Sequence, residues 1–438
     1  MKNVASTYYI ESYGCTLNSG DAELIMFKFE ELGYMKVSHF KDARFIVINT
    51  CGVKTPTEQK ILYRIKKISK FIGKTNFLII TGCLPIILKD DLTKITSIAP
   101  NFAALIGPKN YHELEEIISK ILMGERNIIK IGCQTLAQKV NLKSKPLMKN
   151  IGILPIAEGC KGACTYCCTR FARGHLQSYP ISAIKAKLNL YIKKGIKEIW
   201  ITAEDCSAYH DKEEDATLVD LLNELVTIES KFYIRIGMMN PGTLLSIVDG
   251  MVEIYQNEKI FKFLHIPVQS GSNRVLKAMN RIYNVEDFQR IVQGFKKVIP
   301  DITLSTDIIC GFPGETNKEF EDSLTLIKKI IPDIINISMY GHRPGTPASK
   351  MKQLNSRIVK GRSRSLTKLH DKISPPKLKK WVGWKGEAIV EDYNKKKQNY
   401  LARNSHYKPI IVDNVTLGSI IQLKVVEARK HYLVGKMF

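Results

Sequence analysis

The sequence predicts a mixed α/β fold in three parts. Over residues 6–138, and again over 151–340, short apolar runs alternate with longer amphipathic runs, as in βαβ units with parallel strands. Residues 387–438 hold short alternating runs separated by turn residues, which favour a small β-barrel. We expect an amino-terminal parallel-sheet domain over 1–140, a central incomplete TIM-like (β/α)6 barrel over 146–376, and a small OB-like barrel over 377–438.

Three strands of the amino-terminal domain each end in a cysteine. The predicted strands are YYIESYGC, FIVINTC and NFLIITGC, which close on Cys15, Cys51 and Cys83. Parallel strands bring their carboxyl ends to one edge of a sheet, so these thiols are expected to converge. A lone strand-end cysteine would be an ordinary small buried side chain. Three equivalent ones predict a metal site.

The central region contains six strand-like runs with amphipathic runs between them. The strands are IGILPIA, EIWITAE, FYIRIGMM, FKFLHI, TLSTDIIC and IINISMY, and the helices include SAIKAKLNLYIKKG, ATLVDLLNELVTI, VEDFQRIVQGFKKVI and KEFEDSLTLIKKI. The loops after the strands form the active face of such a barrel. We interpret the Lys-, Ser- and Pro-rich residues 360–380 as a linker to the carboxyl-terminal barrel.

The stretch EGCKGACTYCC carries the densest group of thiols. Cys160, Cys164 and Cys167 form a C-x-x-x-C-x-x-C pattern, which suits three irons of a cubane and leaves the fourth iron without a protein ligand. Structural zinc is the alternative, but it usually takes two C-x-x-C pairs, and no second pair lies nearby. We interpret the adjacent Cys168 as a bystander, because neighbouring side chains seldom point at the same place.

Charge and hydropathy narrow the class of protein. The formal net charge is +24, and residues 351–438 hold 20 Lys or Arg against 6 Asp or Glu. Such a surplus indicates a polyanionic partner such as nucleic acid, although a solvated lysine-rich surface is the alternative. No apolar run approaches the ~20 residues of a membrane helix, so we expect a cytoplasmic protein without a membrane partner.

Several segments together resemble the radical S-adenosylmethionine methylthiotransferase family. The C-x-x-x-C-x-aromatic-C pattern with Tyr166 is similar to the superfamily signature. ESYGCTLNSGDAE, VINTCGVK and TGCLP resemble the amino-terminal motifs, while HIPVQSGSNRVLKAMNRIY, TDIICGFPGET and RPGTPASKM resemble barrel motifs. Residues 386–413 and 418–438 resemble a TRAM domain, the family's RNA-binding barrel. The central region is accordingly expected to be a radical SAM barrel.

The resemblance implies two 4Fe-4S clusters and S-adenosylmethionine. One cluster would cleave S-adenosylmethionine to a 5'-deoxyadenosyl radical, and an auxiliary cluster would carry the sulfur that is methylated and transferred. The implied ligands are Cys160, Cys164 and Cys167 for the first cluster and Cys15, Cys51 and Cys83 for the second.

The remaining site residues are assigned more loosely. Glu204, Gln269 and Asp307 are taken to lie at strand ends and, with Tyr166, are expected to contact S-adenosylmethionine; a helix cap is the alternative for Glu204. The expected substrate contacts are Arg281 and Arg343, with structural ion pairs as the alternative. His265 is interpreted as a hydrogen-bonded strand-end histidine. The unassigned cysteines are expected to be buried small side chains: Cys133, Cys206 and Cys310.

The segment CTYCCTRFARGHLQSYP resembles the archaeal and eukaryotic branch of the family. That branch adds methylthio to C2 of N6-threonylcarbamoyladenosine at position 37 of ANN-decoding tRNAs. The implied partners are tRNA, an electron donor and a sulfur donor, with the protein a monomer. The alternatives are methylthiolation of isopentenyladenosine 37 or of a ribosomal-protein aspartate, or a non-catalytic iron–sulfur protein that binds RNA.

Overall fold

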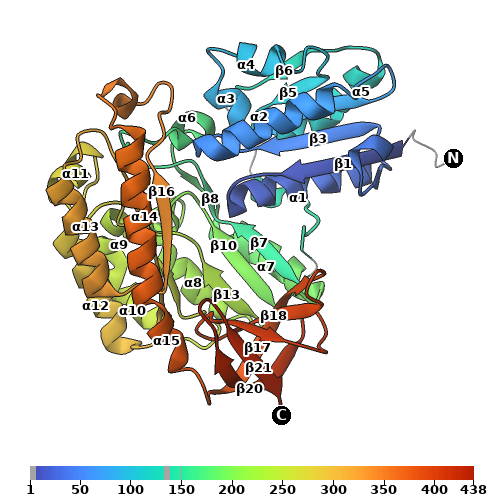
Figure 1. The fold of residues 1–438 in the computed structure, drawn as a ribbon. Coiled ribbons are helices and arrows are strands. Elements are labelled where there is room, and N and C mark those ends of the chain that lie inside the picture. The colour runs from blue at the N-terminus through green and yellow to red at the C-terminus, as the bar shows by residue number, and fades with distance from the viewer. Residues whose placement is uncertain (1–5, 133–138, 149) are drawn as a thin grey trace. The chain divides into compact units, whose positions relative to one another are not determined.

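A computed structural model describes residues 6–132, 139–148 and 150–438. The chain divides into two compact units, coloured along the sequence in Figure 1. Among the described residues, the amino-terminal unit draws on 6–132, 139–147, 157–179 and 341–349, and the barrel unit on 148, 150–156, 180–340 and 350–438. The loop that carries Cys160, Cys164 and Cys167 is therefore part of the same compact unit as Cys15, Cys51 and Cys83.

The amino-terminal unit is built on a six-stranded parallel sheet in the order β2-β1-β3-β4-β5-β6. The strands are β1 (Thr7–Ser12), β2 (Met35–Lys36), β3 (Phe45–Thr50), β4 (Phe77–Gly82), β5 (Ala104–Ile106) and β6 (Ile128–Lys130). Asn49 of β3 pairs with Ser12 of β1 on one side and with Thr81 of β4 on the other. The three strands predicted from the sequence are thus immediate neighbours and end at one edge.

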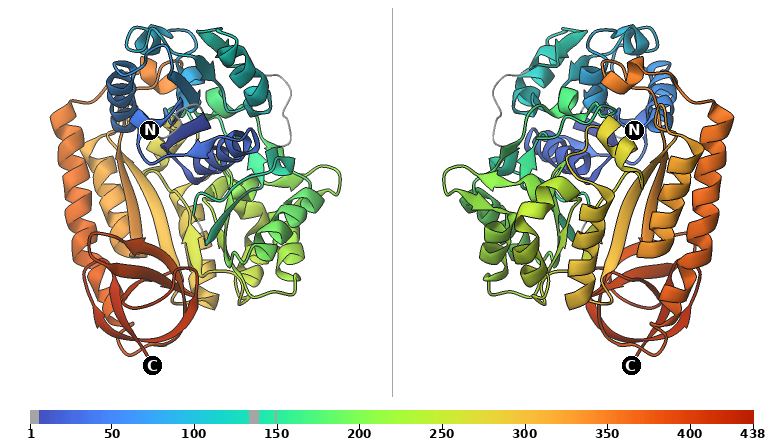
Figure 2. Two further views of the ribbon diagram at one scale, coloured as in Figure 1. Left: turned by 90° about the vertical axis from the view of Figure 1, so that its right-hand side faces the viewer. Right: turned by 90° about the vertical axis from the view of Figure 1, so that its left-hand side faces the viewer.

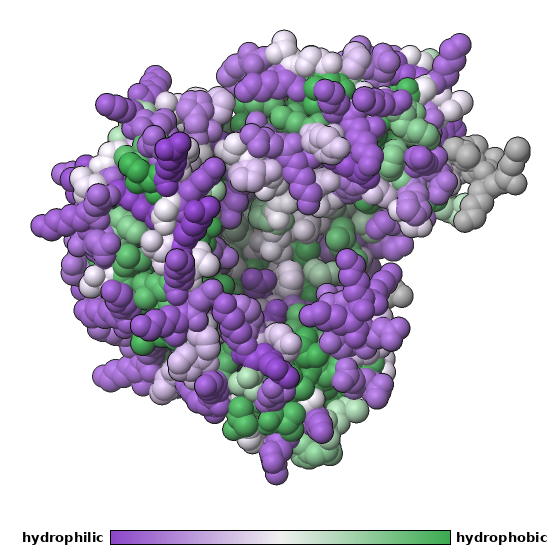
Figure 3. Space-filling model, in the orientation of Figure 1, coloured by the Kyte–Doolittle hydropathy of each residue, from purple (hydrophilic) through white to green (hydrophobic). Residues whose placement is uncertain are grey.

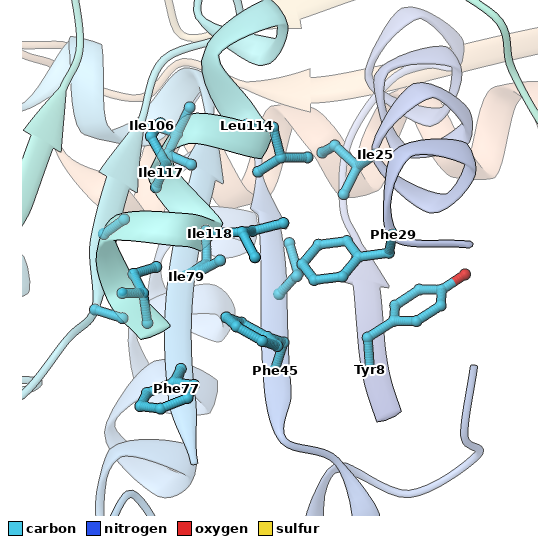
Figure 4. Close-up of a cluster of buried hydrophobic side chains, with 14 of the residues drawn as sticks. Tyr8, Ile25, Phe29, Phe45, Phe77, Ile79, Ile106, Leu114, Ile117 and Ile118 are labelled. Carbon is cyan, nitrogen blue, oxygen red and sulfur yellow. The ribbon is translucent and has the colours of Figure 1, made fainter. Parts of the chain in front are cut away.

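Helices cover both faces of this sheet. The helices α1 (Thr16–Glu31) and α5 (Leu114–Leu122) lie on one face, and α2 (Thr55–Ser69), α3 (Cys83–Ile87) and α4 (Thr93–Thr96) supply side chains to the core on the other. Figure 4 shows the first core, where Phe29 of α1 and Ile118 of α5 pack against Phe45 and Ile79. The β3 and β4 side chains are buried on both faces, which explains their continuous apolar sequence.

The thiol-rich loop of the same unit is closed by a short antiparallel pair. β8 (Ala157–Glu158) pairs with β9 (Gln177–Ser178), and the helix α6 (Thr169–Arg173) lies between them. The Cys160 N–H donates to the Gly174 carbonyl at 3.1 Å, which ties the start of the loop to the end of α6.

The barrel unit contains the six predicted parallel strands in two hydrogen-bonded groups. β7 (Ile151–Pro155), β10 (Glu198–Thr202) and β13 (Tyr233–Ile236) form one group, and β14 (Phe263–His265), β15 (Thr303–Cys310) and β16 (Ile334–Met339) form the other. Bonds from Ile234 N to Lys259 O (2.7 Å) and from Phe261 N to Ile234 O (2.9 Å) join the groups. Among the described residues β7 and β16 do not pair, so the barrel is incomplete as predicted.

The helices between these strands confirm the predicted β-then-α alternation. They are α7 (Ile181–Lys193), α8 (Leu218–Val226), α9 (Pro241–Leu244), α10 (Val248–Ile254), α11 (Asn273–Ala278), α12 (Val285–Val298) and α13 (Asn317–Ile330). A minor antiparallel pair, β11 (His210–Asp211) and β12 (Ala216–Thr217), precedes α8.

The interpretation of residues 360–380 as a linker is wrong. Residues Ser356–Ile373 form the helix α14, followed by α15 (Pro375–Lys379). Val359, Arg362 and Leu366 are buried along one side of α14, at the spacing of an amphipathic helix. Hydrophilic side chains cover its outer side in the space-filling view (Figure 3), and this solvated face produced the linker-like composition.

The carboxyl-terminal residues form a closed five-stranded barrel, as predicted. The strand order is β17-β18-β19-β21-β20, with bounds β17 (Lys385–Asn394), β18 (Asn399–Asn404), β19 (Pro409–Val412), β20 (Ile420–Ala428) and β21 (Leu433–Met437). Its core includes Val390, Ile410, Leu423 and Val425, and Trp381 packs against it.

This closed barrel, red in Figure 2, packs against the amino ends of the parallel strands in its unit. Phe261 and Phe263, at the start of β14, share a buried cluster with Ile389 and Tyr407 of the closed barrel. The Tyr407 hydroxyl donates to Glu198, the first residue of β10, at 3.2 Å. Burial raises the pKa of Glu198, and the nearby Glu391 charge raises it further. The two barrels therefore share one buried interface.

We expect deletion of residues 383–438 to destabilise the rest of the barrel unit. The deletion returns Phe261 and Phe263 to water, at a cost of about 1.5–3 kcal/mol for each side chain. Thermal unfolding followed by circular dichroism should show a lower midpoint. Replacing the exposed Lys395, Lys396 and Lys397 with Gln is the control, with little expected change. An unchanged midpoint after the deletion would show that the interface contributes no stability.

Candidate functional site

The structure brings Cys15, Cys51 and Cys83 to the carboxyl edge of the amino-terminal sheet. Cys51 directly follows β3, Cys83 directly follows β4 and begins α3, and Cys15 lies three residues beyond β1 and precedes α1. A Cβ placed on Gly14 would lie 2.6 Å from the Cys51 Cβ, so the β1 and β3 ends approach closely. The predicted convergence of three strand-end thiols is thus present. Their role as metal ligands stays a prediction.

Glycines make this close approach sterically allowed. Gly14 and Gly82 precede Cys15 and Cys83 and have φ of 115° and 93°, in the region that other L-residues avoid. A Cβ on Gly82 would lie 2.3 Å from the Thr50 carbonyl oxygen. The two cysteines can follow their strands so tightly because no side chain intervenes.

Burial keeps two of these thiols protonated at neutral pH. It raises the pKa of Cys51, and it raises the pKa of Cys83 to about 11, although the positive charge of Arg173 opposes the shift at Cys83. A thiol binds metal as the thiolate, so binding of a cationic group would release these protons. The edge therefore carries protonated thiols at Cys51 and Cys83 until such a group binds.

The second set of thiols lies together on the loop between β8 and β9. Cys160 and Cys164 both face Gly162, because a Cβ placed there would lie 3.4 Å and 3.8 Å from their sulfur atoms. Backbone N–H groups point at two of the sulfurs: Gly162 N donates to Cys160 Sγ at 3.3 Å and Thr169 N to Cys167 Sγ at 3.4 Å. Such hydrogen bonds tune sulfur ligands in iron–sulfur proteins. Tyr166 lies partly exposed between the last two cysteines.

Cys168 faces a different neighbourhood from Cys167. Its side chain is buried, donates to the Gly52 carbonyl at 3.6 Å, and packs with Cys83 and Ala172. Burial and the neighbouring Cys167 charge raise the pKa of Cys168 to about 12. These contacts agree with its interpretation as a bystander to the loop thiols.

Four buried charges connect the two thiol-bearing segments. Arg173 pairs with Asp21 (2.7 Å) and Glu158 (2.8 Å), and Lys139 pairs with the same two carboxylates at 2.9 Å and 2.8 Å. Asp21 lies on α1 after Cys15, and Glu158 lies on β8 before Cys160. Removing one partner from such a buried network costs about 3–5 kcal/mol. Sequence analysis assigned no role to any of the four residues.

The barrel unit holds the other candidate residues. Glu204 lies two residues beyond β10, next to the buried Asp205, which accepts from Ser207 and Asn240 N at 2.8 Å and 3.0 Å. Gln269 lies beyond β14 in a left-handed conformation with φ of 70°. Its backbone pairs with β15, because Gln269 N donates to Asp307 O at 2.8 Å. Both residues follow the carboxyl ends of strands, as predicted.

The expectation that Asp307 ends a strand is wrong. Asp307 is the fifth of the eight residues of β15, since the strand continues to Cys310. Its carboxylate accepts from Asn336 of β16 at 2.6 Å and contacts His265 Nε2 of β14 at 3.0 Å. His265 is therefore the hydrogen-bonded strand-end histidine that the sequence predicted.

Both candidate substrate arginines have internal partners. Arg281 donates to Tyr283 and Asn240, each at 3.0 Å, and Arg343 is buried and pairs with Glu58. Their contact with substrate stays a prediction. Cys206 and Cys310 are fully buried, as predicted, and Cys133 lies outside the described residues.

The described part of the chain holds neither a site for a single metal ion nor a membrane-spanning helix. Within residues 6–132, 139–148 and 150–438, no three His, Cys, Asp or Glu side chains surround one point as ligands of a single metal ion would. The cysteine ligands of a cubane need not surround one point, because each thiolate binds a different iron. No helix within those residues is long and apolar enough to cross a membrane.

Comparison with known proteins places the chain in a family. Residues 154–327 match the radical SAM superfamily, and residues 7–107 match the uncharacterized protein family UPF0004. The probable threonylcarbamoyladenosine tRNA methylthiotransferases of Pyrococcus horikoshii and Pyrococcus abyssi are 38% and 40% identical to the chain, over 98% of this chain and 99% of each relative. The chain belongs to the threonylcarbamoyladenosine tRNA methylthiotransferase family. The human member is 32% identical over 98% of this chain and 73% of its own length.

Solved structures support the fold alone. The radical S-adenosylmethionine methyltransferase TsrM from Kitasatospora setae has a TM-score of 0.58 at 11% identity, covering 79% of this chain and 74% of that chain. The cobalamin-dependent enzyme OxsB has a TM-score of 0.53 at 10% identity, covering 85% and 56%. The superfamily match supports an iron–sulfur cluster and S-adenosylmethionine as cofactors of this family member.

Gly14→Ala tests whether the strand-end thiols bind iron. The added methyl would collide with Cys51 and move Cys15, so less iron should remain after anaerobic reconstitution, measured as iron per chain. Gly33→Ala is the matched control, because Gly33 also has a positive φ but no described heavy atom lies within 4 Å of its added Cβ. Both changes carry backbone strain of about 1–2 kcal/mol. Equal iron in both variants would argue against a site that includes Cys15 and Cys51.

Proposed function

We propose that this protein adds a methylthio group to C2 of N6-threonylcarbamoyladenosine at position 37 of ANN-decoding tRNAs. The observation that carries the proposal is near-full-length similarity to relatives bearing this name, at 38–40% identity for the two Pyrococcus proteins. The radical SAM match and the three-thiol loop supply the matching chemistry. An aromatic C–H bond has no acidic proton, so a radical enzyme is suited to its substitution.

Cys160, Cys164 and Cys167 would hold the cluster that reacts with S-adenosylmethionine. Three thiolates fit a 4Fe-4S cubane with one iron left for a non-protein ligand, and such a cluster supplies the electron that cleaves the sulfonium bond. The backbone donors Gly162 N and Thr169 N orient two of the sulfurs. On the family resemblance, Tyr166, Glu204, Gln269 and Asp307 are assigned to S-adenosylmethionine.

Cys15, Cys51 and Cys83 would hold a second, auxiliary 4Fe-4S cluster. The support is that three thiols lie at one edge of the sheet. Gly14 and Gly82, which precede Cys15 and Cys83, have no side chain and so let the strand ends approach each other closely. Three protein thiolates would leave one iron of such a cluster without a protein ligand, and that iron would be available for the sulfur that is transferred. The protein's part is to keep this edge rigid, because β1, β3 and β4 are paired within one sheet.

The basic carboxyl-terminal part would bind the tRNA backbone. Exposed cations on α14 and in the turn between β17 and β18 include Lys360, Arg364, Lys368 and Lys395–Lys397. Such contacts predict an affinity that falls with salt. An electron donor and a sulfur donor complete the reaction, with the chain acting as a cytoplasmic monomer.

A pair of tRNA substrates tests the proposal. The reconstituted protein, reductant and S-adenosylmethionine are incubated with one tRNA carrying threonylcarbamoyladenosine 37 and with the same tRNA lacking the threonylcarbamoyl group. Nucleoside mass spectrometry should find the methylthio product only from the modified tRNA. A third reaction, on a tRNA carrying isopentenyladenosine 37, should give no product, and a methylthio product there instead would move the protein to the other tRNA branch. Absence of any product, with S-adenosylmethionine still cleaved, would contradict the proposed substrate.

A further inference from the structure

Arg173 is among the most deeply buried charged side chains in the described chain. It ends α6, six residues after Cys167, and its exposed fraction is 1%. A guanidinium stays charged at any ordinary pH, so burial requires partners that compensate the charge. The positions of those partners indicate what the side chain does.

The partners of Arg173 come from both thiol-bearing segments. It pairs with Glu158, before the loop thiols, and with Asp21 of α1, and its Nη2 donates to Asn18 Oδ1 at 3.0 Å. Asn18 in turn donates to the Thr50 carbonyl, next to Cys51, at 3.2 Å. With Lys139, the two carboxylates and two cations form a buried quartet of zero net formal charge.

The guanidinium also reaches the thiol of Cys83. Burial raises the pKa of the Cys83 thiol, and the charge of Arg173 and a hydrogen bond from its side chain act against that shift. The packing agrees, because Ala172 and Cys168 of the α6 segment lie in one buried cluster with Cys83, Ile86 and Ile87 of α3. Arg173 is thus positioned to donate an N–H bond to a sulfur of the strand-end set.

A purely structural role explains the ion pairs of Arg173, but it does not explain why the guanidinium faces the Cys83 thiol. Lys139 already contacts both Asp21 and Glu158, so a second cation could neutralise the quartet without approaching a thiol. The planar fork of Arg can serve two carboxylates and a sulfur at once, which a Lys ammonium does less well. Hydrogen bonds to cluster sulfurs and nearby charge are established determinants of iron–sulfur potentials.

We propose that Arg173 is a positioning residue that raises the reduction potential of the auxiliary cluster through its bond to Cys83. A buried positive charge stabilises the more negative, reduced cluster, and the low-dielectric surroundings strengthen the effect. Because the same side chain holds Glu158 beside the loop, it also sets the loop thiols against the sheet. This inference rests on the proposed function, since it requires a cluster on Cys15, Cys51 and Cys83.

The test uses full-length protein in which Cys160, Cys164 and Cys167 are replaced by Ala, so that one cluster remains. Its midpoint potential is measured by a redox titration followed by electron paramagnetic resonance, with iron per chain measured in parallel. Arg173→Gln should make the equilibrium constant for reduction of the cluster tenfold smaller. This corresponds to a midpoint potential lower by about 59 mV for a one-electron couple. Arg173→Lys, which keeps the charge, should restore part of the shift.

Lys139→Gln is the matched control. It removes the same charge from the same quartet, but Lys139 contacts the carboxylates and the Tyr111 ring. A smaller shift is expected than with Arg173→Gln. If Arg173→Gln does not fold, Arg173→Gln with Glu158→Gln keeps the quartet neutral. This double variant should also lower the potential, but by less than Arg173→Gln, because a nearby negative charge is removed together with the positive one.

The outcomes separate the two hypotheses. Absence of iron in the parent protein would contradict the auxiliary cluster and hence the proposed function. Iron present with an unchanged potential in Arg173→Gln, or an equal shift in Lys139→Gln, would overturn the role of Arg173 while leaving the proposed function intact.

Discussion

Parallel pairing of β1, β3 and β4 is the constraint on which the amino-terminal unit depends. Because the three strands run in one direction and in register, their carboxyl ends must meet at one edge. Cysteines that lie 36 and 32 residues apart in sequence are thereby neighbours. The edge is rigid because both faces of β3 and β4 are covered by packed helices.

The thiol loop shares this rigidity although it lies in a different part of the sequence. Arg173 and Lys139 hold Glu158, which precedes the loop, to Asp21, which follows Cys15. A third segment, residues 341–349, also contacts the loop, because Ala348 N donates to the Thr165 carbonyl at 2.8 Å. Buried ion pairs contribute little net stability compared with apolar packing, but a wrongly placed partner is costly. The quartet thus specifies geometry more than it adds stability.

Sequence reasoning predicted the strands, the closed barrel and the order of elements because each has a local pattern. It missed the buried quartet of Arg173, Asp21, Glu158 and Lys139. Pairs such as Lys139–Asp21 are 118 residues apart, and a single sequence has no local pattern that indicates such a contact. It misread α14 because the solvated face dominates the composition. The buried residues Val359, Arg362 and Leu366 had helical spacing that could have corrected this. Asp307 was misplaced although the predicted strand TLSTDIIC matches β15, because the fifth of its eight residues was taken for the end of the strand.

The central claim is that the two thiol sets do different chemistry within one compact unit. Replacing Cys15, Cys51 and Cys83 together with Ala separates the proposed roles, because in the proposed mechanism cleavage of S-adenosylmethionine needs only the loop thiols. The measurement is the yield of 5'-deoxyadenosine and of methylthiolated nucleoside from the same reaction, with folding checked by circular dichroism. The account predicts that 5'-deoxyadenosine still forms and that no methylthiolated nucleoside appears. Normal methylthiolation by this variant would show that the strand-end thiols do not carry the sulfur, and would contradict the account.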